Sequence, residues 1–211
     1  MARILIIGAS QGIGLETVTA ALAAGHTVRA FSRQASKIAH DDAYLEKVDG
    51  DARDGAALSK ALTGQDCVIQ SLGVPLNPGT ILRGTRLFSE ATRALVDAMT
   101  ANGPHRLIVV TGISAGNSRH ALGPFYGAAF QLSLRRIYDD KDVQEMIVQR
   151  SALEWTIVRP GFLTGGTGPY RALLKPEEWR PGPVSRAAVA RFMIEHLTDP
   201  AFIRQTPLLI A

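Results

Sequence analysis

The chain has 211 residues, which is near the upper end of one domain and long enough to bury a single sizeable core. Hydrophobic residues make up 46% of it, and the net charge is +4 at pH 7. This mild positive charge suits an anionic small molecule, but no lysine- or arginine-rich run marks a nucleic-acid face. We therefore expect one domain, residues 1–211, that binds a small molecule and no nucleic acid.

The cysteine and the apolar runs indicate a compartment. Cys67 is the single cysteine, so it cannot form an internal disulfide, and it lies in an apolar segment typical of a core. The N-terminal apolar run is only one strand long, which predicts no signal peptide, and no stretch approaches the ~20 apolar residues of a membrane helix. The five histidines show no metal-ligand spacing. These observations favour a cytoplasmic protein without a metal or a membrane partner.

The first fourteen residues, MARILIIGASQGIG, organise the rest of the chain. Residues 4–7 are typical of a buried strand, and residues 15–24 predict a helix. Between them Gly8 allows a tight turn, Gly12 lets the backbone approach a pyrophosphate, and Gly14 lets the helix pack on the strand. The helix N-terminus offers unpaired N–H groups and a partial positive charge to an anion. A plain tight turn also collects glycines, but this order of elements favours dinucleotide binding.

The end of the second predicted strand, within residues 26–33, selects the cofactor. NAD sites usually carry an acid here that accepts from the ribose 2′-hydroxyl, whereas an arginine accommodates a 2′-phosphate. Ser32 and Arg33 occupy this place, Lys37 is close by, and no acid precedes Asp41. Because a guanidinium matches a phosphate well, the pattern favours NADP(H). NAD(H) remains the alternative cofactor, and a solvated surface residue remains the alternative interpretation of Arg33.

Two further strands are expected before the middle of the chain. The third lies within residues 43–48, and Asp51 follows it, placed either to face an adenine or to cap the helix at residues 56–62. Asp54 could fill the capping role as well. The fourth strand, residues 66–73, ends on small residues.

Strand and helix patterns continue to alternate in the second half. We expect a long helix at 80–101, a strand at 106–112, two amphipathic stretches at 125–137 and 139–150, and a strand at 154–161. Residues 162–183 predict a long loop on the substrate side, Ser185 caps a last helix that ends at Leu197, and residues 207–211 predict an edge strand. This order predicts an α/β, Rossmann-type, doubly wound parallel sheet of six to seven strands with helices on both faces.

The chain resembles the atypical short-chain dehydrogenase/reductase family, and within it the NAD(P)H-binding NmrA-like and flavin or biliverdin reductase-like proteins. The resemblance covers essentially the whole chain. It is carried by GASQGIG at the front, SR after the second strand, GDARD after the third, SLG after the fourth, EWTIVRPGFLT and VSRAAVARFM. These motifs are specific for the fold and the cofactor, not for a substrate.

The resemblance implies where each part of the dinucleotide lies. The residues that it assigns are Gly8, Ser10, Gln11, Gly12 and Ile13 at the pyrophosphate; Ser32 and Arg33 at the 2′-phosphate; Asp51 and Ala52 at the adenine; Ser71, Leu72 and Gly73 at the ribose; and Thr111, Gly112, Ile113, Pro160, Gly161 and Phe162 at the nicotinamide.

The catalytic residues of the family are only partly present. Catalytic short-chain dehydrogenases use a serine after the fifth strand, a tyrosine as general acid and a lysine four residues after the tyrosine. Here Ser114 follows the fifth strand and Tyr126 lies twelve residues later, but Phe130 stands where the lysine belongs. Tyr138 has Lys141 three residues on, which misses the spacing as well. Ser114 and Tyr126 are the catalytic candidates, against ordinary packing as the alternative.

Two functions fit this pattern. The first is an NADPH-dependent oxidoreductase that transfers a hydride to a small flavin-, quinone- or carbonyl-type acceptor. It tolerates the missing tyrosine–lysine pair because the cofactor carries the hydride and water can supply a proton. The alternative is an NmrA-like redox sensor that binds NADP(H) without catalysis. A monomer and a homodimer both fit the sequence.

Overall fold

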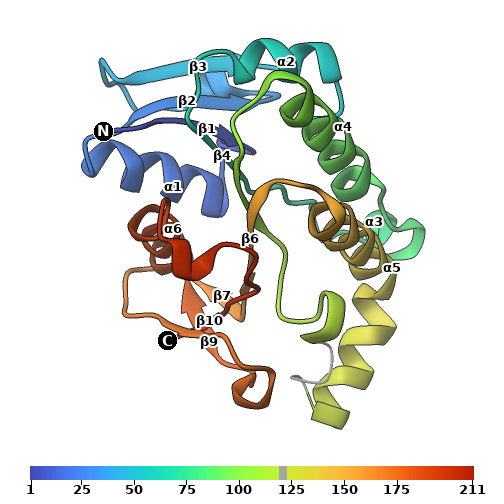
Figure 1. Cartoon of the computed structure of the whole chain (residues 1–211). Coiled ribbons are helices and arrows are strands. Elements are labelled where there is room, and N and C mark those ends of the chain that lie inside the picture. Colours follow the sequence, from blue (N-terminus) through green and yellow to red (C-terminus); the bar gives the residue numbers. More distant parts are fainter. Residues whose placement is uncertain (119–122) are drawn as a thin grey trace.

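The computed structural model describes residues 1–118 and 123–211, and for residues 123–133 it describes the helical backbone only. Strands and helices alternate along most of the chain (Figure 1). The strands are β1 (Arg3–Ile7), β2 (Thr27–Ser32), β3 (Leu45–Asp49), β4 (Cys67–Gln70), β5 (Arg106–Val110), β6 (Glu154–Pro160), β7 (Phe162–Thr164), β8 (Arg171–Leu173), β9 (Pro183–Ser185) and β10 (Leu208–Ile210). The helices are α1 (Gly12–Ala23), α2 (Gly55–Leu62), α3 (Pro78–Arg83), α4 (Leu87–Asn102), α5 (Gly123–Arg150) and α6 (Arg186–Glu195), with short 3₁₀ turns η1 (Ala35–Lys37), η3 (Pro176–Glu178) and η4 (Pro200–Phe202).

The main sheet has eight strands in the order β3-β2-β1-β4-β5-β6-β10-β8. All neighbours are parallel except β10 and β8, which are antiparallel. The chain runs outward from β1 through β2 to β3 and then returns to β4 on the other side of β1. The strand order therefore reverses beside β1, which is where ligands bind in open α/β sheets. The doubly wound parallel sheet predicted from the sequence is confirmed, with more strands than expected.

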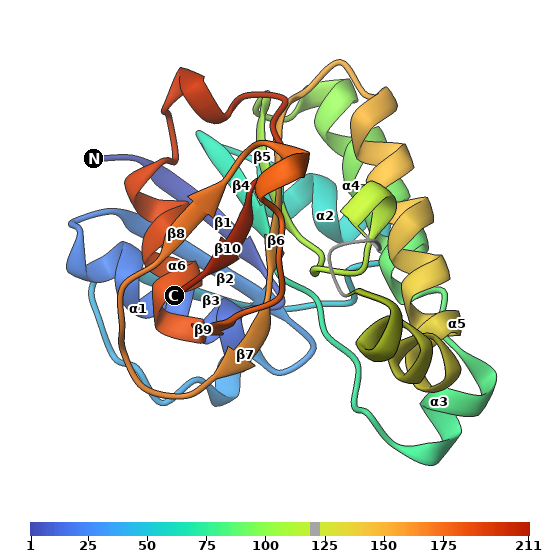
Figure 2. The same ribbon diagram turned by 90° about the horizontal axis from the view of Figure 1, so that it is seen from below.

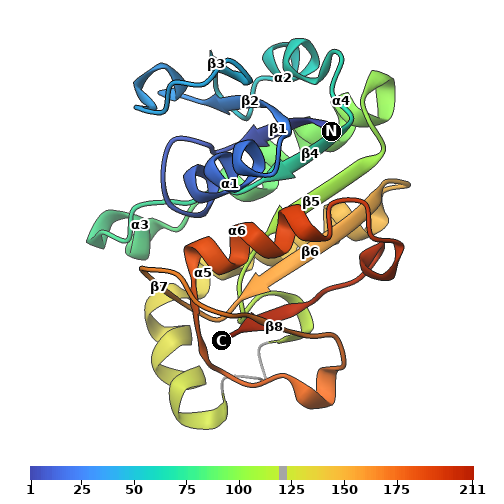
Figure 3. The same cartoon turned by 90° about the vertical axis from the view of Figure 1, so that its left-hand side faces the viewer.

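Each face of the sheet has its own hydrophobic core, because side chains alternate along a strand. In β1, Ile4 and Ile6 pack with α1 and α6, whereas Leu5 and Ile7 pack with α2, α4 and α5. Figure 2 shows the two helical layers on either side of the sheet, and Figure 3 shows α1 and α6 on one face. All four β1 side chains are fully buried, and each contributes about 1.5–3 kcal/mol.

The single helix predicted at residues 80–101 is wrong. Gly84 takes a φ of +74° after α3, a conformation that suits glycine, and the chain begins α4 only at Leu87. The start of α4 is then capped from another helix. The Asp140 carboxylate of α5 accepts hydrogen bonds from the backbone N–H of Phe88 at 2.9 Å and of Ser89 at 3.4 Å.

Three other expectations need correction, two of them because backbone pairing between distant segments overrides a local pattern. The two amphipathic stretches at 125–137 and 139–150 form one helix, α5. The loop at 162–183 contains β7, β8 and η3, and β7 pairs with β9 outside the main sheet. The edge strand expected at 207–211 is β10, which lies between β6 and β8. Strands of only three residues are too short to show a period, and their backbone partners lie far away in sequence.

Candidate functional site

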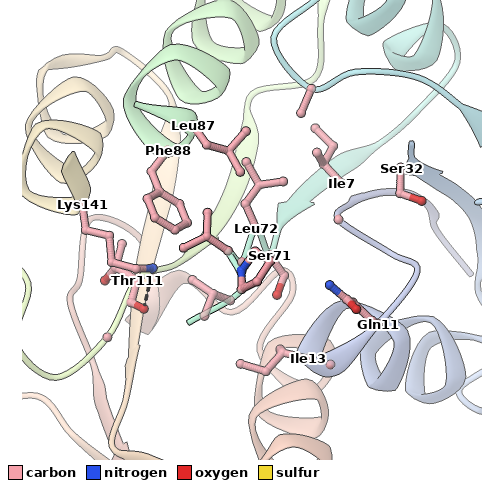
Figure 4. A pocket seen from close by; sticks show the side chains of 18 of the residues that line it. Ile7, Gln11, Ile13, Ser32, Ser71, Leu72, Leu87, Phe88, Thr111 and Lys141 are labelled. Atoms are coloured by element: carbon pink, nitrogen blue, oxygen red, sulfur yellow. Dashed lines mark hydrogen bonds between the residues drawn. The ribbon is translucent and has the colours of Figure 1, made fainter. Parts of the chain in front are cut away.

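A cleft of about 950 Å³ opens at the carboxyl ends of the central strands. Its walls come from the segments after β1, β2, β3, β4, β5 and β6, together with residues of α4, α5 and α6. Figure 4 shows Gln11, Ile13 and Ser32 on one side, Ser71 and Leu72 in the middle, and Phe88, Thr111 and Lys141 on the other side. The cleft therefore spans the reversal in strand order beside β1.

The glycine-rich turn lies at the centre of the cleft. Gly8 has a φ of +85°, and a Cβ there would come within 2.2 Å of the Ser71 carbonyl oxygen, so the turn needs glycine for space and for conformation. Gly12 has a φ of +59°, but a Cβ there would meet nothing within 4 Å. The N-cap residue of α1, Gln11, makes no side-chain capping bond. The first N–H groups of α1 are thus available to an anion, over open space.

Basic and acidic side chains meet at the β2 and β3 end of the cleft. Arg33 is exposed, and among the residues that the structure describes no carboxylate forms a salt bridge with it. Asp51 accepts from the Arg53 backbone N–H at 2.9 Å and from Arg53 Nη2 at 2.7 Å. These hydrogen bonds lower the pKa of Asp51 to about 2. Asp54, not Asp51, caps α2, because its carboxylate accepts from the Ala56 N–H at 2.9 Å.

The β5 and β6 end of the cleft is formed by Thr111, Gly112, Pro160 and Gly161, and side chains of α5, among them Tyr138 and Lys141, complete it. Lys141 is 8% exposed, and its Nζ donates to the Thr111 carbonyl at 3.0 Å. The Nζ also lies 4.2 Å from the centroid of the Phe88 ring. Burial lowers the pKa of Lys141 to about 8, against the opposing charges of Glu145 and Asp140. Burial also raises the pKa of Tyr138, another α5 side chain that lines the cleft, to about 12.

The Thr111 side chain is hydrogen-bonded to a buried ion pair between Glu145 and Arg159. The Thr111 hydroxyl donates to Glu145 Oε1 at 2.7 Å, and Arg159 donates to the same carboxylate from Nε at 3.0 Å and Nη2 at 2.6 Å. The side chains of Arg159 and Glu145 are 1% and 2% exposed. Arg159 also donates to Asn117 at 2.8 Å, and its guanidinium lies over the Trp179 ring. Removing one partner of such a pair costs about 3–5 kcal/mol of stability. Because the Thr111 hydroxyl bonds to the same carboxylate as Arg159, the network keeps Thr111 in one position.

The structure brings most of the sequence-predicted residues together. All of the expected cofactor contacts line the cleft except Ile113 and Phe162. Ile113 is buried against Leu173 and Trp179, and Phe162 is 42% exposed on β7. Ser114 is 3% exposed and is not among the residues that line the cleft. Tyr126 lies outside the residues whose side chains the structure describes.

Several lining residues were not expected from the sequence. α5 contributes Leu134, Ile137, Tyr138 and Lys141, whose spacing of three, four and seven residues places them on one helical face. This spacing is visible in the sequence and could have predicted that the four side chains share one face of a helix. The other unexpected lining residues are Ile7, Phe31, Gln34, Gly50, Arg53, Val74, Pro75, Leu76, Leu87, Phe88, Val110, Leu163 and Arg186.

The charges in the cleft favour an anionic ligand. Among the residues that the structure describes, the charged ones lining it are the cations Arg33, Arg53, Lys141 and Arg186 and the acid Asp51. Within the described residues, no three His, Cys, Asp or Glu side chains gather to hold a metal ion. Nor is any described helix long and apolar enough to cross a membrane.

A doubly wound sheet with an open helix N-terminus and a basic cleft at its strand reversal defines a dinucleotide-binding protein. The sequence profile of a family described as NAD(P)H-binding matches residues 8–200. The chain belongs to this NAD(P)H-binding family, and the resemblance to atypical short-chain dehydrogenase/reductases is confirmed.

Several known proteins are similar over most of their length. The uncharacterized sugar epimerase YhfK of Bacillus subtilis is 28% identical over 211 residues, covering 93% of this chain and 88% of its own. The chloroplastic protein At2g34460 of Arabidopsis thaliana, also uncharacterized, is 26% identical over 202 residues, covering 92% of this chain and 71% of its own. The solved structure of ChuY from Escherichia coli O157:H7, an anaerobillin reductase, has a TM-score of 0.80 at 28% identity and covers 99% of this chain and 96% of that chain.

Proposed function

We propose that the protein is an NADPH-dependent oxidoreductase that transfers a hydride to a small acceptor of flavin, quinone or carbonyl type. One observation carries the proposal: a single cleft joins the open N-terminus of α1 to a chamber with mostly apolar walls at the ends of β5 and β6. The first part suits a dinucleotide, and in this proposal the second part takes the acceptor beside the nicotinamide.

The α1 end of the cleft binds the cofactor in this proposal. The unpaired N–H groups of α1 hold the pyrophosphate, and the open space over Gly12 lets it approach the backbone. Arg33, exposed and near Asp51, binds the 2′-phosphate and gives NADP(H) its advantage over NAD(H).

The other end holds the acceptor. Its walls include Leu76, Phe88, Ile137 and Leu163, and Leu76 and Leu163 are 66% and 41% exposed at the surface. Such walls suit a flat, largely apolar molecule that can lie against a nicotinamide ring. ChuY, described as an anaerobillin reductase, is similar along its whole length, which supports a reductase function.

Catalysis in this proposal depends mainly on positioning. The bound nicotinamide supplies the hydride, so the protein has to hold the acceptor against it and exclude competing reactions. Thr111, fixed by Glu145 and Lys141, forms a rigid edge of the chamber. Ser114 and Tyr126 remain predictions as substrate-polarising groups.

The test is NADPH oxidation by the purified protein over a panel of FMN, riboflavin, 1,2-naphthoquinone and 4-nitrobenzaldehyde, after calorimetry has shown that NADPH binds. We expect binding and turnover with at least one acceptor. Binding without turnover on any of them would instead favour the redox sensor, and absence of binding would refute both functions.

A further inference from the structure

We propose that Lys141 is the catalytic residue that donates the proton accompanying hydride transfer, a role that rests on the proposed reductase function. It lies at the acceptor end of the cleft, where α5, α4 and β5 meet (Figure 4).

Among the described residues, the contacts of the Lys141 ammonium use only part of its capacity to donate. A lysine ammonium has three N–H donors. One donates to the Thr111 carbonyl at 3.0 Å, and the Phe88 ring lies 4.2 Å from the Nζ on another side. Lys141 also lines the cleft, and the proposal places a remaining N–H against an acceptor atom bound there. The position is fixed, since Glu145 holds the Thr111 side chain and Asp140 holds the start of α4 next to Phe88.

The charged groups around Lys141 are already engaged with other partners. Its own helix supplies Asp140, which caps α4, and Glu145, which pairs with Arg159 of β6. α4 presents the Phe88 ring and β5 presents the Thr111 carbonyl, and neither of these titrates. Within the described residues, no carboxylate forms a salt bridge with Lys141. Its ammonium can therefore lose a proton without breaking an ion pair.

The acidity of Lys141 suits proton donation better than that of Tyr138 does. Burial lowers the pKa of Lys141 to about 8, so the group is protonated at neutral pH and still gives up its proton readily. Burial raises the pKa of Tyr138, which also lines the cleft, to about 12. Lys141 is thus the stronger acid of the two.

The hydride forms a C–H or N–H bond on the acceptor, and the electron pair displaced from the reduced double bond takes the proton from Lys141 Nζ. NADPH becomes NADP⁺, the acceptor gains two hydrogens, and the neutral amine regains a proton from solvent. An aldehyde acceptor needs this proton most, because its reduced oxygen is strongly basic.

The experiment measures kcat against pH, from 6 to 10, for reduction of 4-nitrobenzaldehyde by NADPH, with the aldehyde as the probe. The wild-type kcat should be constant below about pH 8 and fall tenfold per unit above it, because the neutral amine cannot donate. Lys141→Met should lower kcat by about 10²–10⁴-fold and remove this fall, while the Kd for NADPH, measured by fluorescence, changes by less than about threefold.

Two variants separate proton donation from other effects. Lys141→Arg keeps the charge but holds its proton at these pH values, so it should remain at least about tenfold slower than wild type. Lys47→Met is the matched control, because Lys47 Nζ also donates to a backbone carbonyl, that of Ile38 at 2.8 Å, but lies outside the cleft. It should leave kcat and the pH profile unchanged.

Several results would overturn the assignment. These are a wild-type profile flat from pH 7 to 10, a Lys141→Met kcat within about threefold of wild type, or a Lys141→Arg variant with full activity. The wild-type profile decides the question even if Lys141→Met fails to fold in circular dichroism. If wild type binds no NADPH, or reduces no acceptor of the panel, the proposed function itself fails. NADPH binding and turnover are measured before the variants, so this failure is told apart from a failure of the assignment of Lys141.

Discussion

Replacing Arg33 with alanine tests the assignment of the cofactor most directly. Arg33 is exposed beside Asp51 at the β2 and β3 end of the cleft. A charge-assisted hydrogen bond to a phosphate is worth about 1.5–3 kcal/mol, which corresponds to roughly 10- to 150-fold in affinity. Because Arg33 is exposed, solvent and salt screen the contact, and we expect the lower half of this range. Arg53 cannot easily replace it, since its guanidinium is held by Asp51 at 2.7 Å.

The assay is calorimetric titration of wild type and Arg33→Ala with NADPH and with NADH. Wild type should bind NADPH more tightly, and the variant should lose affinity for NADPH while keeping that for NADH, which has no 2′-phosphate. Arg150→Ala, which removes an exposed arginine from the end of α5, controls for the change in net charge. Raising the salt concentration should weaken NADPH binding to wild type more than to Arg33→Ala.

Equal affinity of wild type for the two cofactors would refute the reasoning from Ser32 and Arg33. A variant that loses NADH and NADPH affinity alike would show that Arg33 contacts a part common to both molecules.

Three further predictions concern the rest of the cleft. Gly12→Val should fold, as checked by circular dichroism, although the φ of +59° costs about 1–2 kcal/mol of stability. It should bind NADPH poorly in calorimetry because the side chain fills the open space over the turn, and normal binding would mean that the pyrophosphate lies elsewhere. Tyr126→Phe should lower kcat/KM by less than about 10-fold and by less than Ser114→Ala, because no lysine follows the tyrosine at four residues; a larger loss would reverse this ranking. Glu145→Gln should lower the free energy of unfolding by about 3–5 kcal/mol, which lowers Tm by roughly 6–20 °C in calorimetry, because it breaks the buried pair with Arg159. Glu46→Gln is the control: the Glu46 side chain is 55% exposed in its pair with Arg29, so the loss should be less than about 1 kcal/mol, and equal losses in the two variants would contradict the reasoning.

Local sequence was sufficient for the elements that depend on neighbours in the chain. The apolar run of β1, the glycines after it and the start of α1 lie within residues 3–23, so their geometry follows from backbone preferences that residue type alone sets. The same holds for Ser185, whose Oγ accepts from the Ala188 N–H as a local cap. The carboxyl ends of parallel strands share one edge, which agrees with the assignment of residues from distant strands to one cleft that the family resemblance implied.

Long-range contacts decided the rest. Lys141 reaches the carbonyl of Thr111, thirty residues away in the chain, because α5 packs beside β5, and no local pattern reports that approach. Likewise Asp140 caps α4 from a different helix, and β10 finds its place between β6 and β8 through backbone pairing. Residue types, spacing and the family resemblance predicted the glycine-rich end of the cleft, whereas the β5 and β6 end depends on how α5 packs against the sheet, which only the folded chain establishes.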